Sequence, residues 1–398
     1  MIGYYQVKSP LSQMTEESAA AFIVSVSEAL GEELKRVSAD EYAASDFALL
    51  YVASGGSEGF FKQIWDKVSE KHCYILTSGA SNSLAAAMEI LSFIHQNGGE
   101  GEIIHGTVKD IAARIRALQA VDLAYASLRG LRIGMVGDPS DWLIASRPFE
   151  SALKEKLGIT VVHIPVSRLA EEAEKKQYIP NTLTEELIGK AFDFGETQKA
   201  FYVYGALKRI CEQERLSAVT VRCFDLLDRL HTTTCLGLAI LNCEGITAGC
   251  EGDMPSLLAM MLQQAVTGKG AFMCNPSRID PAAKKAVFAH CTLPVNMVDE
   301  YDCDTHFESG IGVAIRGHFN PDTFTIFKCS GDLSEYHVQV ATSEPMDFDP
   351  NLCRTQITLN LEDPYYFLRS PIGNHHVLSR GDHRQQLIDL MDRINMVR

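Results

Sequence analysis

The sequence lacks the marks of a membrane protein, a secreted protein and a nucleic-acid-binding protein. No run approaches the roughly 18 apolar residues of a membrane span, and Met1 to Pro10 lack the basic and apolar segments of a signal peptide. The 36 basic residues are outnumbered by 51 acidic ones, and a net charge of -15 disfavours binding to a polyphosphate backbone. We therefore expect a cytoplasmic protein with no membrane or nucleic acid among its partners.

Patterned cysteines and nucleotide-binding motifs are missing as well. Eleven cysteines, an odd number, are scattered from Cys73 to Cys353 without a CxxC pair. Many stand in apolar runs, such as Cys235 in TCLGLAIL, which predicts buried reduced thiols. No GxGxxG or Walker pattern follows the first strands, so nucleotide binding has little support.

The chain instead has the material for several globular domains, because its 398 residues are 46% hydrophobic and 22% charged. Short apolar runs alternate with helical patterns over residues 1–128, which predicts a parallel sheet covered by helices. A second alternation opens with LRIGMVGDPSDW and predicts a second Rossmann-like domain over 129–240. From about Tyr301 the strands follow one another without helices, which is typical of an antiparallel sheet or small barrel. We expect an α/β protein with two Rossmann-like parallel-sheet domains and, over 241–398, a C-terminal antiparallel β-barrel-like domain that carries the site.

The stretch from Asn242 to Asp280 carries the most chemistry. The strand GITAGC delivers Glu251 and Asp253 to the start of an apolar helix, where a carboxylate is held rigidly near backbone donors. Asp253 is equally well explained as the N-cap of this helix. Glu251 has no such explanation, because it follows an apolar strand where a solvated charge has little reason to be.

Other segments end apolar strands with polar residues. AFMCNP ends on Asn275, AVFAHCTLP carries His290, and SPIGNHHV presents His375 and His376. Because adjacent residues of an extended segment point to opposite faces, only one histidine of the last pair is expected to face a metal ion. Arg222, in TVRCFD, is a candidate contact for an anion or hydroxyl, although an ion pair with Asp225 or Asp228 explains it as well.

In this order CEGD, FMCNP, AHCTLP and GNHHV with GDHRQQL resemble the L-fucose isomerase and L-arabinose isomerase superfamily. The N-terminal half resembles it only in its α/β pattern. The resemblance implies an aldose-ketose isomerase that binds Mn²⁺, or another divalent cation such as Mg²⁺ or Co²⁺. Glu251 then matches the first acidic ligand, His375 the histidine ligand and His290 a histidine near the metal, while Asn275 occupies the second acidic position. A trimer or hexamer with active sites at subunit interfaces is also implied.

Isomerisation moves a proton between C1 and C2 of an open-chain sugar through a cis-enediol, and a divalent ion would stabilise the developing negative charge. Glu251, Asn275 and His290 are the expected catalytic residues, and Arg222, Asp253 and His376 are expected to contact the sugar. Asn275 cannot accept a proton, so the second proton-transfer group stays open among Asp253, His290 and Glu58 of a neighbouring subunit. The loss of a carboxylate leaves the ion more positive, which favours an anionic, for example sulfonated, sugar; a deoxy sugar is the other substrate that we expect.

Two other functions fit the same residues. A sugar-binding or regulatory protein that has lost catalysis would explain the loss of the second carboxylate at Asn275. A metal-dependent sugar epimerase or lyase would use the same enediolate chemistry.

Overall fold

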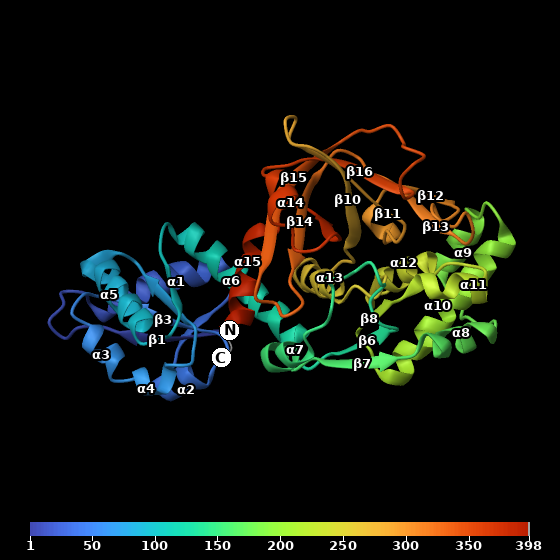
Figure 1. The fold of residues 1–398 in the computed structure, drawn as a ribbon. Helices are drawn as coiled ribbons and strands as arrows, with labels where there is room; N and C mark the ends of the chain where they lie inside the picture. The colour runs from blue at the N-terminus through green and yellow to red at the C-terminus, as the bar shows by residue number, and fades with distance from the viewer. Residues whose placement is uncertain (397–398) are drawn as a thin grey trace. The chain divides into compact units, whose positions relative to one another are not determined.

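A computed structural model describes residues 1–396 of the chain, which divide into two compact units, Met1–Leu123 and Ala124–Arg398 (Figure 1). The first unit contains a five-stranded parallel sheet in the order β2-β1-β3-β4-β5. Its strands are β1 (Ile2–Val7), β2 (Leu34–Arg36), β3 (Ala48–Val52), β4 (Cys73–Thr77) and β5 (Gly101–Ile104). Its helices are α1 (Glu16–Leu30), α2 (Ala39–Ala44), α3 (Glu58–Lys62), α4 (Trp65–Val68), α5 (Ser83–Gln96) and the start of α6 (Val108–Leu128).

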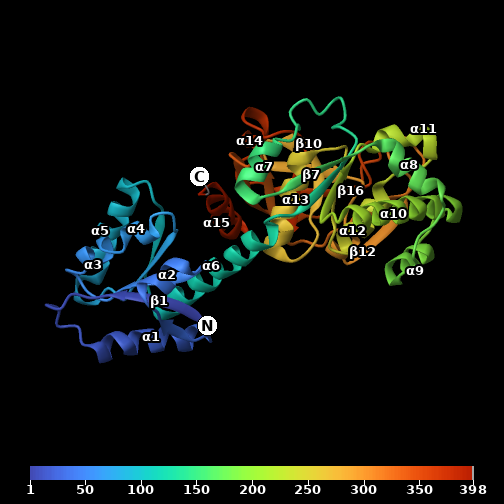
Figure 2. The same ribbon diagram turned by 90° about the horizontal axis from the view of Figure 1, so that it is seen from below.

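Both faces of this sheet are covered, as the continuous apolar run ALLYV of β3 requires. Residues of α1 and α6 pack on one face, and residues of α3, α4 and α5 pack on the other (Figure 2). Every residue of β3 is buried as a result.

The second unit begins with a four-stranded parallel sheet in the order β7-β6-β8-β9. Its strands are β6 (Arg132–Val136), β7 (Thr160–Ile164), β8 (Ala218–Val221) and β9 (Thr247–Cys250). The helices of this part are α7 (Glu150–Leu157), α8 (Val166–Glu174), α9 (Thr182–Gly189), α10 (Phe194–Glu214), α11 (Leu227–Leu230), α12 (Cys235–Cys243) and α13 (Met254–Thr267).

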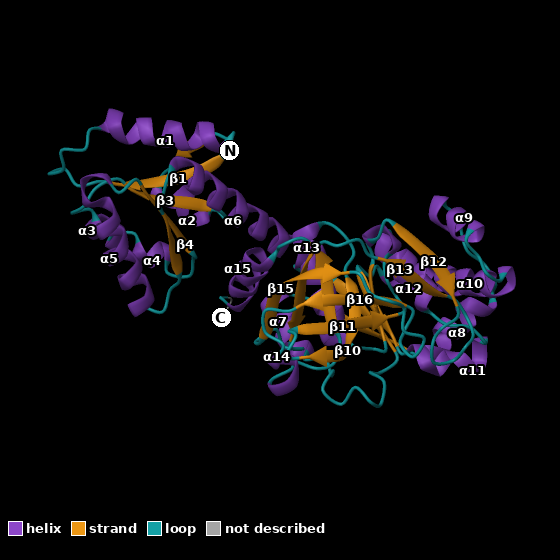
Figure 3. Cartoon of the chain, turned by 90° about the horizontal axis from the view of Figure 1, so that it is seen from above, coloured by secondary structure: helices purple, strands orange, loops and turns teal. Residues whose placement is uncertain are grey.

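A closed antiparallel barrel follows, in the order β10-β11-β16-β15-β14-β17 (Figure 3). Its strands are β10 (Phe272–Asp280), β11 (Lys285–His290), β14 (Thr323–Cys329), β15 (Tyr336–Glu344), β16 (Thr355–Asn360) and β17 (His376–Arg380). Outside it lie the hairpin of β12 (Glu300–Asp304) and β13 (Ala314–His318), and the helices α14 (Tyr365–Arg369) and α15 (Arg384–Asn395). The predicted fold class, parallel-sheet α/β domains followed by a β-barrel, is therefore confirmed; the boundaries predicted at residues 128 and 240 stay predictions.

Helix α13 joins the parallel sheet to the barrel, because it contacts β8 and β9 on one side and β14 and β17 on the other. Its residues from Met254 to Gln263 are all buried, which explains why its sequence is apolar all round. The turn between β9 and α13 therefore lies where the two layers meet. One strand differs from expectation: β10 runs on to Asp280 instead of ending at Asn275, since a register shift after Pro276 accommodates the proline within the ladder. No helix among the described residues is long and apolar enough to cross a bilayer.

Candidate metal centre

The turn that carries Glu251 has a strained backbone. Glu251 has φ 62° and Gly252 has φ 70°, so two consecutive residues adopt the left-handed conformation. For a residue with a Cβ this conformation costs on the order of 1–2 kcal/mol. Hydrogen bonds from the Ser140 N–H to the Glu251 carbonyl and from the Gly252 N–H to the Val221 carbonyl hold the turn. The surrounding structure thus imposes the backbone that aims the Glu251 side chain.

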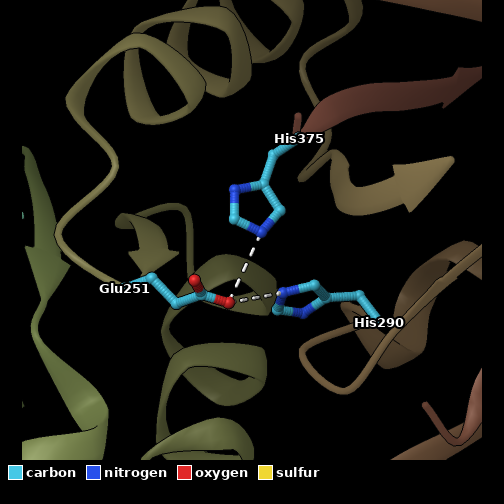
Figure 4. A group of neighbouring side chains, drawn as sticks. All are labelled: Glu251, His290 and His375. Atoms are coloured by element: carbon cyan, nitrogen blue, oxygen red, sulfur yellow. Dashed lines mark ion pairs between the residues drawn. The ribbon is translucent and has the colours of Figure 1, made fainter. Parts of the chain in front are cut away.

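Three side chains converge in front of this turn: Glu251, His290 and His375 (Figure 4). Glu251 Oε1 lies 3.4 Å from His375 Nε2 and 3.7 Å from His290 Nε2. All three residues are buried, and one ligand atom from each lies within 4.8 Å of the others. They come from the β9–α13 turn, the end of β11 and the residue before β17, so the barrel supplies both imidazoles and the parallel sheet supplies the carboxylate.

The environment of His375 fits a metal ligand. Its Nδ1 lies 2.8 Å from Asp253 Oδ2, so in the neutral ring the proton is assigned to Nδ1 and the Nε2 lone pair faces Glu251. Although His375 is fully buried, this Nε2 has no hydrogen-bond partner. An unpaired buried polar atom costs about 1–3 kcal/mol, and a divalent ion bound between the imidazoles and the carboxylate would satisfy it. The residues present therefore fit such an ion.

The charges of the cluster depend on one another. Burial opposes ionisation of Glu251, but the imidazoles of His290 and His375 outweigh it and hold the pKa of Glu251 well below its usual range. Burial likewise opposes protonation of His375, but Asp253 and Glu251 raise the pKa of His375 to about 9. Without an ion a proton would occupy His375, so an ion has to displace it on binding.

Asp253 and Lys328 form a second layer behind the histidine. Asp253 is fully buried and has two contacts: Oδ1 accepts the Ser256 N–H at 2.9 Å and caps α13, while Oδ2 faces His375. Lys328 of β14, only 1% exposed, donates to Ser256 Oγ at 2.7 Å and has Nζ 3.8 Å from Asp253 Oδ1. The N-cap expected at Asp253 is therefore present, whereas its predicted contact with the sugar stays a prediction; its contact with His375 was not foreseen in the sequence.

A loop after β6 reaches the other oxygen of Glu251. The Trp142 indole N–H donates to Glu251 Oε2 at 2.6 Å, a short bond of the kind that a charged acceptor makes. The Trp142 ring also packs edge-on against Phe224, with the ring centroids 5.0 Å apart. Glu251 is therefore held through both oxygens, one toward the histidines and one toward this loop.

Asn275 lies with the cluster at a cleft in the second unit. The residues that line this cleft include Glu251, Asn275, His290, Phe224, His306, Glu308 and five cysteines: Cys223, Cys235, Cys250, Cys291 and Cys353. All eleven cysteines are free thiols, nine of them buried, in accord with the reduced state expected from the sequence. Asn275 Oδ1 accepts a weak hydrogen bond from Asn374 at 3.4 Å, which leaves the amide oxygen facing the cleft region without a strong partner.

The structure does not bring Arg222 and His376 into the cluster. Arg222 donates to Asp225 at 2.8 Å, to the Pro139 carbonyl at 2.7 Å and to Asp141 at 3.0 Å, so it ties the β6–α7 loop down as a structural ion pair would. His376 points away from His375, as expected for adjacent residues, and its Nε2 lies 3.0 Å from the hydroxyl of Tyr366. Burial lowers the pKa of His376 to about 3.

Four residues near the site were missed in the sequence: Trp142, Lys328, His306 and Glu308. Lys328 had a visible signal, because it interrupts the apolar strand TFTIFKC, in which all residues after the first are buried. Trp142 follows a strand end, as many site residues do, but nothing local points to a contact with a residue 109 positions away. His306 and Glu308 lie in a loop whose place over the cleft is fixed only by the tertiary fold.

No protein-family model matches the chain. Among curated proteins, the sulfoquinovose isomerase of Priestia megaterium (strain ATCC 12872 / QMB1551) is 22% identical over 342 residues, covering 79% of this chain and 75% of the relative. The sulfoquinovose isomerase of Priestia aryabhattai gives the same values. That of Clostridium sp. (strain MSTE9) is 25% identical over 301 residues, covering 71% of this chain and 67% of the relative.

These relatives confirm the prediction of an enzyme: the chain is a sugar isomerase of the aldose-ketose type, an intramolecular oxidoreductase. The reading as a binding protein without catalysis is therefore disfavoured. Kinship with the L-fucose and L-arabinose isomerases stays a prediction that rests on the motifs quoted above.

Proposed function

We propose that the chain is a metal-dependent aldose-ketose isomerase that acts on a sulfonated sugar through a cis-enediol. The observation that carries the metal dependence is the buried group of Glu251, His290 and His375, with the unpaired Nε2 of His375 at its centre. The relatives named for sulfoquinovose support the sulfonated substrate.

In this proposal Glu251, His290 and His375 hold the ion, and the Asn275 carbonyl oxygen is available as a further ligand. An ion such as Mn²⁺ would supply a positive charge that polarises the sugar carbonyl and stabilises the enediolate. One carboxylate with two imidazoles suits a transition ion such as Mn²⁺ or Co²⁺ better than Mg²⁺, which prefers oxygen ligands. Asp253 fixes the ring of His375, and Trp142 fixes the carboxylate of Glu251.

The charge of this ligand set favours an anionic substrate. A divalent ion with one carboxylate and two neutral imidazoles keeps one net positive charge, whereas a second acidic ligand at position 275 would cancel it. At a separation of several ångströms, an attraction of this kind is worth about 1–2 kcal/mol at an effective dielectric constant near 20–40. We therefore expect kcat/KM for a sulfonated aldose to exceed that of the neutral parent sugar by about 5- to 30-fold.

The test starts from chain stripped by a chelator and then reconstituted separately with Mn²⁺, Mg²⁺ or Co²⁺. Isomerisation is measured for sulfonated, phosphorylated and neutral forms of one aldose, and exchange of the C2 proton with deuterated solvent is followed by NMR. We expect activity only with metal, exchange at C2 and a preference for the sulfonated form. Equal kcat/KM for the neutral sugar would refute the anionic substrate, and full activity after chelation would refute the metal dependence.

A matched pair of variants tests the ligand assignment. Glu251→Gln keeps the shape and removes the charge, so we expect it to lose both bound metal and turnover. Glu155→Gln, on the exposed side of α7, removes a carboxylate of the same kind away from the site and should change neither. An active, metal-replete Glu251→Gln variant would show that the ligand set is wrong.

Three further expectations stay proposals. These are the trimeric or hexameric assembly with the active site at a subunit interface, the cytoplasmic location and the contacts of Arg222, Asp253 and His376 with the sugar. Analytical ultracentrifugation of the metal-loaded chain tests the first of them.

A further inference from the structure

The proposed reaction needs a group that moves a proton between two carbons, and the cluster offers no free one. Both oxygens of Glu251 are engaged, Oε1 toward the two imidazoles and Oε2 with the Trp142 indole. Asp253 is fully buried behind His375, and the amide of Asn275 is neither an acid nor a base. His290 is taken up as a ligand in the proposed function, so two ionisable side chains other than thiols remain in the lining of the cleft: His306 and Glu308.

These two residues lie in a compact loop between β12 and β13. The Gly310 N–H donates to the His306 carbonyl at 2.9 Å, and the His306 N–H donates to the Ile311 carbonyl at 3.2 Å. Arg354 fastens the start of the loop, with its Nε 2.8 Å from the Thr305 carbonyl. The loop is therefore rigid enough to aim a side chain.

Within the loop, His306 holds the carboxylate of Glu308. His306 is buried, and its Nε2 lies 3.0 Å from Glu308 Oε2. Its Nδ1 lies 2.9 Å from Ser309 Oγ and is approached by the Ser309 N–H at 3.4 Å. Since that N–H is only a donor, the neutral ring is assigned its proton on Nε2, and Nε2–H donates to Glu308. Unlike the buried ring, the Glu308 side chain is 49% exposed and open to the cleft.

A chain of aromatic contacts connects this pair to the metal centre. The rings of Phe224 and His306 pack edge-on with centroids 5.8 Å apart, and Phe224 packs on Trp142, which donates a hydrogen bond to Glu251. Glu308 and Glu251 therefore line the same cleft, with Phe224 in contact with a neighbour of each. The hydrogen bond from His306 also holds the pKa of Glu308 below its ordinary value, so this carboxylate is ionised at neutral pH.

We propose that Glu308, oriented by His306, is the carboxylate that carries the proton between C1 and C2, in place of the acidic ligand that Asn275 replaces. This inference rests on the proposed function. In the aldose-to-ketose direction Glu308 takes the proton from C2, the electron pair of that C–H bond becomes the C1–C2 double bond, and the electron pair of the C1 carbonyl moves onto its oxygen. The hydroxyl proton on the oxygen of C2 then passes to the oxygen of C1 as the carbonyl forms at C2, and Glu308 returns its proton to C1. C1 is reduced, C2 is oxidised, and no other reactant is needed.

A purely structural role, in which the pair only ties the loop, makes different predictions. If Glu308 transfers the proton, Glu308→Gln in the metal-loaded chain should lower kcat by about 10²- to 10⁴-fold. Exchange of the C2 proton with deuterated solvent should fall by the same factor, while bound metal and melting temperature stay unchanged. Glu300→Gln, which removes an exposed carboxylate from the neighbouring strand β12, is the matched control and should keep full activity.

His306 is a positioning residue in this scheme, and its test is a pH profile. Removing its hydrogen bond with His306→Asn lets the pKa of Glu308 rise, so the acid limb of kcat/KM should move to higher pH. The other charged or titratable groups that face the pair are Glu251, His290, Cys291, Cys353 and Arg354, and none of them is changed in this variant. A simple loosening of the loop would lower activity at all pH values without moving the limb.

The outcomes separate the inference from the function beneath it. If the wild-type chain exchanges no C2 proton of any aldose, both the isomerase function and the role of Glu308 are refuted. If the wild type exchanges this proton and Glu308→Gln exchanges it at a similar rate, only the role of Glu308 is refuted. If Glu308→Gln does not fold, Glu308→Asp decides: it keeps the charge but withdraws the carboxylate by one methylene, and a kcat unchanged within threefold would overturn the proposal.

Discussion

Asp253 offers the sharpest test of how the metal centre is built. Asp253→Asn keeps an amide oxygen of the same shape, and Asn caps helices as well as Asp does, so the bond to the Ser256 N–H can persist. What the change removes is the negative charge beside His375 and Lys328. The variant therefore isolates the effect of that charge on the ligand.

Two effects set the magnitude. Loss of a carboxylate behind a metal-bound histidine usually costs 10- to 100-fold in metal affinity, which is about 1.4–2.7 kcal/mol. Against this, Asp253 also raises the pKa of His375, to about 9 in the protein without metal, so below pH 9 a proton competes with the ion in the wild type. Competition lowers the apparent affinity by about tenfold for each pH unit below the pKa. We expect the metal affinity of the wild type to exceed that of Asp253→Asn by the full 10- to 100-fold near pH 9. This difference in affinity should shrink toward pH 7.

The assay is titration of metal-free protein with Mn²⁺ at several pH values between 6.5 and 9, under nitrogen, with calorimetric detection. Asp193→Asn is the matched control, since Asp193 caps α10 in the same way but at an exposed position. Denaturant unfolding of the metal-free variant measures the cost of removing the carboxylate beside the buried Lys328, which is about 3–5 kcal/mol for a broken buried ion pair. Equal Mn²⁺ affinities at pH 9, or a difference that does not change with pH, would refute the reasoning.

Three other changes act on the same centre. Gly252→Ala would place a Cβ 2.7 Å from the Asp138 carbonyl oxygen at φ +70°, so we expect the free energy of unfolding to fall by about 2–4 kcal/mol in denaturant. Gly268→Ala is the control, because Gly268 has φ +69° but nothing within 4 Å of the added Cβ, and it should cost only about 1 kcal/mol. Trp142→Phe removes the indole N–H that bonds the carboxylate of Glu251, and it should weaken Mn²⁺ binding by about tenfold in calorimetry. An unchanged affinity would show that this hydrogen bond does not contribute to metal binding. Asn275→Asp adds a carboxylate to the cleft, so it should tighten Mn²⁺ binding and reduce the preference for sulfonated over neutral aldose; an increased preference would contradict the charge argument.

The sequence was informative where chemistry coincides with a local pattern. Glu251 stood out because a charge followed an apolar strand, and the opposite orientation of His375 and His376 followed from strand geometry alone. The apolar helix expected after Asp253 is likewise present as α13. These features depend on residues close together in the chain, where periodicity and turn chemistry are read directly.

The remaining parts depend on contacts that no local pattern encodes. The indole that holds Glu251 comes from a loop 109 residues earlier, and the buried lysine behind Asp253 comes from a barrel strand. Asn275 was expected at the end of a strand, but β10 continues past Pro276 through a bulge. Pairings of this kind are fixed when the parallel sheet and the barrel pack on α13, so they appear only in the folded structure.

The two oxygens of Glu251 connect the ion to the loop after β6. One oxygen faces the imidazoles and the other accepts the indole N–H of Trp142, a residue that is more than half exposed. The position of the loop and the binding of the ion thus depend on the same carboxylate. Thermodynamic linkage then requires that the indole contact change the affinity for the ion by the same factor as the ion changes the equilibrium of that contact. An ion bound to Glu251 in this orientation would therefore favour the Trp142 contact, and loss of that contact would weaken binding of the ion by the same factor.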